Sequence, residues 1–249
     1  MAKVLEICAD SLMSARAAVS GGADRIELCS ALTMGGLTPY DMLLGQIREE
    51  SDIPVRCLMR PRAGDFLYTR EEILLMGRQM EQLSAAGADG FVIGCLTAEG
   101  DLDQQAMEYL IGCAGGKGLT LHRCIDVSRD PEKTYLDAME LGIDTVLTSG
   151  CASGCLGGLE VIRRLLDLRD SRQGPEVLIG AGVKAPVIRQ IRQTLPQARA
   201  FHMSGKTEIP SGMIFRREGV PMGAPGLDEW HIQVTGESAV RQAREAMDE

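Results

Sequence analysis

Apolar runs alternate with helix-like segments along the whole chain, and three of the junctions between them share one pattern. In each, a helix-like segment stops at glycine, and one small or aliphatic residue and an aspartate lead into an apolar run. The three junctions are Gly22-Ala23-Asp24, Gly87-Ala88-Asp89 and Gly142-Ile143-Asp144. Glycine ends a helix in a left-handed conformation at little steric cost, so each junction predicts a helix, a cap and a strand. The pattern therefore predicts repeated β/α units.

Eight apolar runs fit this pattern as strands, and the segments between them have helical periodicity or helix-start signals. The expected strands lie near residues 4–10, 24–30, 54–61, 89–96, 119–126, 145–150, 177–183 and 200–205. Thr69 with Glu72 predicts a capping box, and Asp130-Pro131 pairs a capping side chain with proline at the first helical position. Most strands are therefore expected to lead into a helix.

Alternating strands and helices indicate a parallel sheet, and eight units in 249 residues match the size of an α/β fold, the (β/α)8 TIM barrel. An open, doubly wound sheet is the competing topology, but no G-x-G-x-x-G turn follows the first strand. We expect a single TIM-barrel domain over residues 1–249. The insertion over residues 207–232, between strand 8 and the last helix near 238–247, is expected to be either a lid or an oligomer contact.

Composition narrows the class of protein further. The net charge of -9 and the pI near 5.0 argue against a nucleic-acid-binding surface. The first residues lack the features of a signal peptide, and no apolar run approaches the length of a membrane span. The eight cysteines are expected to be reduced thiols rather than disulfide partners. These features predict a cytoplasmic protein with neither nucleic acid nor membrane as a partner.

Side chains alternate between the two faces of a strand, so each barrel strand presents one set to the interior and one to the helices. The helices need the aliphatic sets, which leaves polar and sulfur-bearing residues for the interior. These residues are Glu6, Cys8, Arg25, Glu27, Cys29, Arg56, Arg60, Arg62, Thr120, His122, Cys124 and Asp126. Burying an unpaired ion is costly, so the charged groups must pair with one another, as a structural network, or with a ligand. Those at the carboxyl ends of strands are functional candidates, because that rim carries the active site in such barrels.

The segment after strand 3 has the densest charge at this rim. Arg60 and Arg62 flank a proline and predict a clamp for a carboxylate or phosphate, with Asp65 orienting them or acting as a base. The alternative is a structural loop clamp in which Asp65 pairs with Arg60.

Candidates for proton transfer follow strand 5. Histidine in general titrates near neutrality, and a carboxylate can fix its tautomer, so His122 and Asp126 predict an acid/base pair, with Glu27 as a further group that moves a proton. The alternative for His122 is a core histidine bonded to a neighbour. His202 is a further candidate, because it lies beside apolar Phe201 and Met203 but on the same face as Ser204.

Strands 7 and 8 end in glycine-rich turns, where barrels of this type often bind phosphate on backbone amides. The candidate anion-binding residues are Gly180, Gly182, Ser204, Gly205 and Lys206. Tight turns explain the same glycines equally well.

Several ordered motifs make the chain similar to a known family. They are EIC at 6–8, IELCSALTMGGLTP at 26–39, RPRAGDF at 60–66, LHRCID at 121–126, VLTSG at 146–150, GAGV at 180–183, FHMS at 201–204 and SGMIFR at 211–216. On these motifs the chain resembles the CutC family of copper homeostasis proteins over nearly its whole length. The resemblance implies a cytoplasmic (β/α)8 barrel, a homodimer or homotetramer, and a role in copper handling. The chain departs from the family at Ala63, where a second glycine is usual, and at Cys124-Ile125, where Ala-Phe is usual.

Two functions stay open at this point, and with them the question of whether the chain is an enzyme. Cu(I) prefers soft sulfur donors, and Cys8 and Cys29 on adjacent expected strands would bind it, with Cys124 or Met59 as a third ligand. Packing of these cysteines in the core is the structural alternative. The second function is an enzyme that acts on a small anionic or phosphorylated metabolite. In it, Arg60 and Arg62 clamp the anion, and His122 and Asp126 act as acid and base.

Overall fold

A closed ring of eight parallel strands forms the centre of the molecule, in a computed structural model that describes residues 3–217, 219–220, 222–223 and 228–249. The strands follow one another in sequence order, and β1 pairs with both β2 and β8. The predicted barrel is therefore confirmed, and the open sheet is excluded. The strands are β1 (Val4–Ala9), β2 (Arg25–Leu28), β3 (Val55–Leu58), β4 (Gly90–Ile93), β5 (Gly118–Leu121), β6 (Thr145–Thr148), β7 (Glu176–Ile179) and β8 (Ala200–Met203).

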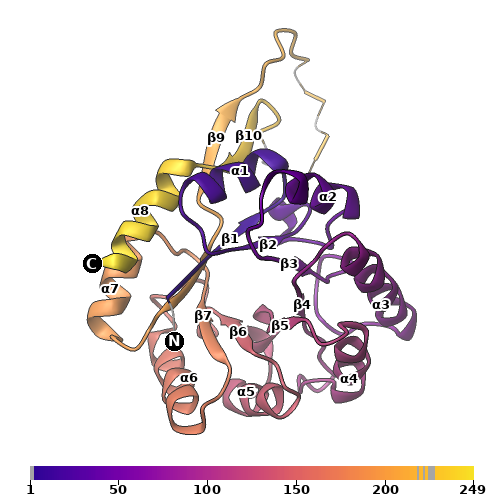
Figure 1. Cartoon of the computed structure of the whole chain (residues 1–249), viewed down its shortest axis with the longest axis vertical. Helices are drawn as coiled ribbons and strands as arrows, with labels where there is room; N and C mark the ends of the chain where they lie inside the picture. Colours follow the sequence, from indigo (N-terminus) through magenta and orange to yellow (C-terminus); the bar gives the residue numbers. More distant parts are fainter. Residues whose placement is uncertain (1–2, 218, 221, 224–227) are drawn as a thin grey trace.

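Helices surround the barrel as an outer ring, as Figure 1 shows. They are α1 (Leu12–Ser20), α2 (Asp41–Glu50), α3 (Arg70–Ala85), α4 (Gln104–Cys113), α5 (Pro131–Glu140), α6 (Leu159–Arg172), α7 (Ala185–Thr194) and α8 (Glu237–Asp248). The capping box of Thr69 and Glu72 begins α3, and Asp130 caps α5 with Pro131 in its first turn, as predicted. None of the helices within the described residues is long and apolar enough to cross a membrane.

The three glycine–aspartate junctions tie the amino ends of neighbouring strands together. Each aspartate accepts a hydrogen bond from a backbone N–H at the start of the preceding strand, and each forms an ion pair with an arginine. The pairs of aspartate and N–H donor are Asp24 with Leu5, Asp89 with Val55 and Asp144 with Leu119. The arginine partners are, in the same order, Arg244, Arg48 and Arg56. The repeated aspartate therefore stabilises the end of the barrel at which the strands begin, opposite their carboxyl ends.

The two faces of the strands differ as the alternation predicts. Leu5 and Ile7 of β1 are fully buried in the large core between strands and helices. A small cluster of Cys8, Cys29, Leu58 and Val92 lies on the other face, inside the barrel. Glu6 and Glu27 are also buried, so the barrel interior contains carboxyl groups as well as thiols.

The insertion after β8 forms a two-stranded antiparallel sheet of β9 (Lys206–Pro210) and β10 (His231–Thr235). Figure 1 shows this sheet leaving the edge of the barrel and projecting outward past α1, rather than folding across the strands. Ile214, in the segment between the two strands, is 100% exposed, and Phe215 is 67% exposed. The described part of the insertion therefore has the form of an arm and does not cover the barrel.

Candidate functional site

A pocket of about 420 Å³, called the mouth pocket below, opens at the carboxyl ends of the barrel strands. Its walls combine charged, sulfur-bearing and apolar side chains from loops around the ring. The lining residues are Cys8, Glu27, Leu32, Met34, Gly35, Leu58, Arg60, Phe66, His122, Arg123, Leu147, Ala181, Gly182, Val183, His202, Met203 and Ser204. The volume and the mixed lining are typical of a small-molecule site.

Two thiols lie together at this end of the barrel: Cys8 lines the pocket, and Cys29 is fully buried behind it. The sulfur atoms of Cys8 and Cys29 are 3.5 Å apart, and the Cys8 thiol donates a hydrogen bond of 3.3 Å to Oε1 of Glu27. The hydrogen bond with Cys29 and burial raise the pKa of Cys8 well above its usual range. Cys8 therefore carries a proton that a bound metal would have to displace.

Glu6 forms a buried network beside the thiols. It forms an ion pair with Arg25 on β2. Its Oε1 also forms a hydrogen bond of 2.8 Å with Nδ1 of His202 on β8. Burial alone would raise the pKa of Glu6, but the Arg25 charge and the bond from His202 lower it to about 2. Burial lowers the pKa of His202, but the charge of Glu27 and the bond to Glu6 outweigh it and raise that pKa. One of the two expected roles for the interior charges was a structural ion network. Glu6 and Arg25 form such a network.

Glu27 has one free oxygen in this cluster. Its Oε2 is buried and has no partner among the described residues, and burial raises its pKa. One potential ligand atom from each of Cys8, Glu27 and His202 lies within 4.8 Å of the other two. Together with Cys29, these residues could hold a metal ion.

His122 lies across the ring, on the loop that follows β5. Its Nδ1 accepts a hydrogen bond of 3.1 Å from the backbone N–H of Cys124, and its ring packs 4.6 Å from the ring of Phe66. Its Nε2 is buried and has no partner among the described residues. Burial and the nearby Arg60 charge lower the pKa of His122 to about 3. His122 is therefore neutral near pH 7, with the hydrogen on Nε2.

The low pKa of His122 predicts a measurable effect on stability. Between about pH 6.5 and pH 3 the unfolded chain takes up a proton that the folded chain does not, so this residue lowers stability as the pH falls. The asparagine of a His122→Asn variant would keep an acceptor for the Cys124 N–H and cannot titrate. We expect this variant to reduce the slope of unfolding free energy against pH by about 1.4 kcal/mol per pH unit around pH 4 to 5. Urea unfolding at a series of pH values measures this, and equal slopes would contradict the assignment.

Arg60 and Arg62 do not form the predicted paired clamp. Arg60 lines the pocket, and its guanidinium donates to the backbone carbonyls of Met34, Gly36 and Gly64. Arg62 is outside the pocket lining because other groups bind it. Its ion pairs are with Glu72 at 2.7 Å and Asp65 at 3.1 Å, and its guanidinium stacks on Tyr68. Arg60 thus clamps two loops, as the structural alternative proposed, although the partner of Asp65 is Arg62 and not Arg60.

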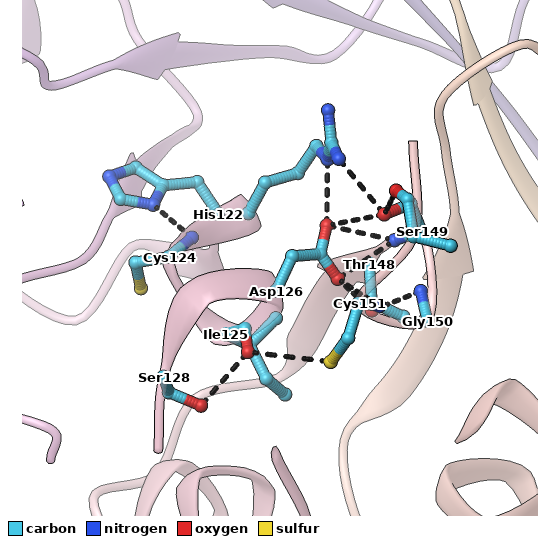
Figure 2. A network of polar contacts seen from close by, with 11 residues as sticks. His122, Cys124, Ile125, Asp126, Ser128, Thr148, Ser149, Gly150 and Cys151 are labelled. Carbon is cyan, nitrogen blue, oxygen red and sulfur yellow. Dashed lines mark hydrogen bonds and ion pairs between the residues drawn. The ribbon is translucent and has the colours of Figure 1, made fainter. Parts of the chain in front are cut away.

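The predicted pair of His122 and Asp126 is also wrong. Figure 2 shows the His122 ring directed away from Asp126, toward the backbone of Cys124. Asp126 instead forms an ion pair of 2.7 Å with Arg123, and it accepts hydrogen bonds from Thr148, Ser149 and the backbone N–H of Cys151. Asp126 therefore ties the loop after β5 to the loop after β6 and has no contact with the pocket histidine.

Cys124 does not join the other two candidate thiols. β5 ends at Leu121, and Arg123–Val127 form a 3₁₀ helix, η2, so strand alternation no longer applies at Cys124. Its side chain is buried in the large outer core, whereas Cys8 and Cys29 belong to the interior cluster. Of the three predicted metal ligands, the structure brings two together.

Three of the five candidate anion-binding residues line pockets, and they are divided between two of them. Gly182 lines the mouth pocket, Lys206 lines a second pocket of about 330 Å³ beside the arm, and Ser204 borders both. A side chain at Gly180 would lie 2.7 Å from Leu147, and Gly205 has a φ of +57° against β10. Gly205 therefore fits the turn interpretation, Gly180 is restricted by packing against Leu147, and the five residues do not form one phosphate cradle.

Sequence reasoning gave no role to several residues of the pocket wall, among them Phe66 and Ala181. Phe66, inside the RPRAGDF motif, stacks between His122 and Arg60. Its place in a charged loop was a signal that could have been used. Ala181 has a left-handed φ of 69°, which is unusual for a residue with a side chain, and no sequence signal marks it.

Comparison with known proteins identifies relatives along nearly the whole chain. The model of the CutC family matches residues 3–207. A family protein CutC of Chromobacterium violaceum is 40% identical over 248 residues, which is 100% of this chain and 99% of that protein. A family protein CutC of Xanthomonas campestris is 44% identical over 205 residues, which is 82% of this chain and 84% of that protein.

Solved structures support the same assignment. The crystal structure of the Streptococcus agalactiae CutC protein, named for copper homeostasis, has a TM-score of 0.75 at 27% identity and covers 81% of this chain and 98% of its own. N-(5'-phosphoribosyl)anthranilate isomerase from Pyrococcus furiosus has a TM-score of 0.55 at 15% identity and covers 99% of this chain and 98% of its own, a likeness of fold alone. On the family match and the full-length relatives, the chain belongs to the CutC family.

Proposed function

We propose that this chain binds Cu(I) in the cytoplasm as part of copper homeostasis, and that Cys8 and Cys29 hold the ion. The observation that carries this proposal is the 3.5 Å separation of two sulfur atoms beneath an open pocket. Cu(I) prefers soft sulfur ligands, commonly in small numbers. All eight cysteines are free, which suits a reducing compartment. The name of the Streptococcus relative supports the biological role.

The residues around the two thiols fit a metal that arrives and leaves as cargo. Cys8 must lose its proton to bind Cu(I), and the carboxylate of Glu27, 3.3 Å from the sulfur, is placed to accept it. The raised pKa of Glu27 makes it a better proton acceptor than an exposed glutamate. His202 is the third candidate ligand, and its raised pKa favours the protonated form, which competes with metal binding. Affinity for Cu(I) is therefore expected to rise with pH.

The direct test is an anaerobic titration in which the protein competes with a colorimetric Cu(I) chelator. We expect the wild-type chain to retain one Cu(I) per chain at pH 7, and to bind it more tightly at pH 8 than at pH 6. A chain that leaves all Cu(I) with a chelator of micromolar affinity would contradict the proposal.

A second candidate function is an enzyme that acts on a small anionic metabolite in the same pocket. The observation that favours it concerns His122 and Glu27, which both line the pocket. Nε2 of His122 and Oε2 of Glu27 are buried, and neither has a hydrogen-bond partner among the described residues. A Cu(I) site on Cys8 and Cys29 makes no use of His122. In this function His122 donates a hydrogen bond to the substrate, and Glu27 moves the proton.

We also propose that the chain forms a homo-oligomer through the arm. Met213, Ile214 and Phe215 expose apolar surface between β9 and β10, and exposed apolar patches of this kind are typical of contact surfaces. Light scattering after gel filtration should give a dimer or tetramer for the wild type. The double variant Ile214→Ser and Phe215→Ser should give a monomer, while Val127→Ser, at an exposed site outside the arm, should not. A monomeric wild type would contradict this proposal.

A further inference from the structure

Two hydrogen-bond donors on one side of the mouth pocket lack an acceptor. They are Nε2 of His122 and Nε of Arg60, both buried and without a partner in the described part of the chain. The Phe66 ring packs 4.6 Å from the His122 ring and 5.4 Å from the Arg60 guanidinium, so one aromatic side chain supports both donors. A buried donor without an acceptor is costly, and such groups call for an explanation.

Neighbouring contacts fix the orientation of both donors. The backbone N–H of Cys124 occupies Nδ1 of His122, so the neutral ring must carry its hydrogen on Nε2. Arg60 uses its terminal nitrogens to bind the carbonyls of three backbone groups, which leaves Nε. Both residues line the mouth pocket, and between them they have two unused N–H donors and one full positive charge.

The opposite side of the pocket has a different character. Cys8, Glu27 and His202 come from β1, β2 and β8, which are neighbours in the ring, whereas β5 lies across the barrel from β1. Glu27 keeps a free oxygen there, which suits a hydroxyl or amino group of a ligand. The apolar Leu58 and Leu147 complete the lining between these two polar ends.

We propose that the mouth pocket binds a small organic carboxylate, whose oxygen atoms accept the hydrogen bonds of His122 Nε2 and Arg60 Nε. This inference rests on the second function proposed above and names its substrate class. A carboxylate carries one negative charge, which matches the single guanidinium at this site. A phosphate carries more negative charge than one guanidinium balances, and the glycine turns after β7 and β8 supply no joint cradle of backbone amides for it.

The backbone conformation of the turn after β7 supports the assignment of this end of the barrel as a binding surface. Ala181 and Gly182 both line the pocket and both have positive φ angles, of 69° and 76°. A residue with a side chain in this conformation stores backbone strain, and such strain is concentrated at functional sites. The strained turn leads directly into Val183, which also lines the pocket.

The test uses the full-length chain and nuclear magnetic resonance of its histidine rings. The chain has three histidines, so the His122 signals can be assigned with single variants. The probes are carboxylates of about two to six carbons, with and without hydroxyl groups, beginning with acetate. Inorganic phosphate and glycerol phosphate form a second arm. Calorimetry gives the dissociation constant of any probe that shifts the His122 ring.

Two substitutions of the same residue make the test specific. The asparagine in His122→Asn keeps the acceptor for the Cys124 N–H but lacks a group in the place of Nε2, whereas the longer side chain in His122→Gln can extend an amide toward that place. We expect at least one carboxylate to shift the His122 ring signals. Its binding should weaken about tenfold or more in His122→Asn, less in His122→Gln, and not at all in His231→Asn on the exposed arm.

Three results would overturn the inference. The first is that no carboxylate of the panel shifts the His122 signals of the wild-type chain, a readout that does not depend on any variant folding. The second is that a carboxylate binds His122→Asn as tightly as the wild type. The third is that only the phosphate compounds shift His122; the carboxylate assignment then fails, while the function on an anionic metabolite stands.

Discussion

Replacing either Cys8 or Cys29 by serine is expected to weaken Cu(I) binding by at least about a hundredfold. Changes to groups that only support a metal ligand cost about ten- to a hundredfold in affinity, so losing a ligand itself should cost at least as much. The two sulfur atoms are 3.5 Å apart, and serine offers a hard oxygen donor that Cu(I) does not favour. Competition with a Cu(I) chelator under anaerobic conditions measures the loss.

The control for this prediction is Cys151→Ser. Cys151 is exposed and its backbone N–H binds Asp126, outside the pocket with the two thiols. This variant should retain the affinity of the wild type, as should Cys113→Ser on α4. Equal affinity of the wild type, Cys8→Ser and Cys29→Ser would show that copper binds elsewhere or not at all.

The second large effect concerns the buried charge network. We expect Arg25→Met to lower the free energy of unfolding by about 3 to 5 kcal/mol, because the carboxylate of Glu6 would stay fully buried without its guanidinium partner. His202 keeps its contact with Glu6 and offsets part of the loss. Urea unfolding at pH 7, followed by circular dichroism, measures the change.

Two further variants separate charge from packing in this prediction. Removing both partners, with Glu6→Leu and Arg25→Met together, should recover much of the lost stability, because no carboxylate without its guanidinium partner is left at this position. Arg16→Met breaks an ion pair with Glu50 on the surface and should change stability little. If Arg25→Met were as mild as Arg16→Met, the network would not have the role described.

The fold was predictable because its signals are periodic and local. The glycine–aspartate junctions and the apolar runs defined the eight strands, and alternation placed Glu6, Cys8 and Glu27 inside the barrel. The proximity of Cys8 and Cys29 followed from the same rule, since Cys8 lies on the inner face of β1 and Cys29, directly after β2, belongs to the same interior cluster. Within a strand, the side chains of residues i and i+2 lie on the same face of the sheet, so assigning one of them assigns the other.

Prediction failed where strands give way to loops. The strand expected over 119–126 ends at Leu121, and the 3₁₀ helix that follows turns Cys124 away from the interior. Arg62 and Asp126 were assigned to the pocket by the same alternation, but ion pairs with Glu72 and Arg123 hold them elsewhere. Such pairing depends on residues brought together by the fold, which spacing along the sequence does not specify.

The measurement that tests the copper proposal most directly is X-ray absorption at the copper edge, on the wild-type chain loaded with one equivalent of Cu(I). We expect two sulfur atoms in the coordination shell, and one in each of the variants Cys8→Ser and Cys29→Ser wherever copper is still retained. A shell of nitrogen and oxygen alone, or a wild-type spectrum that either variant reproduces, would contradict a Cu(I) site at the base of the barrel pocket.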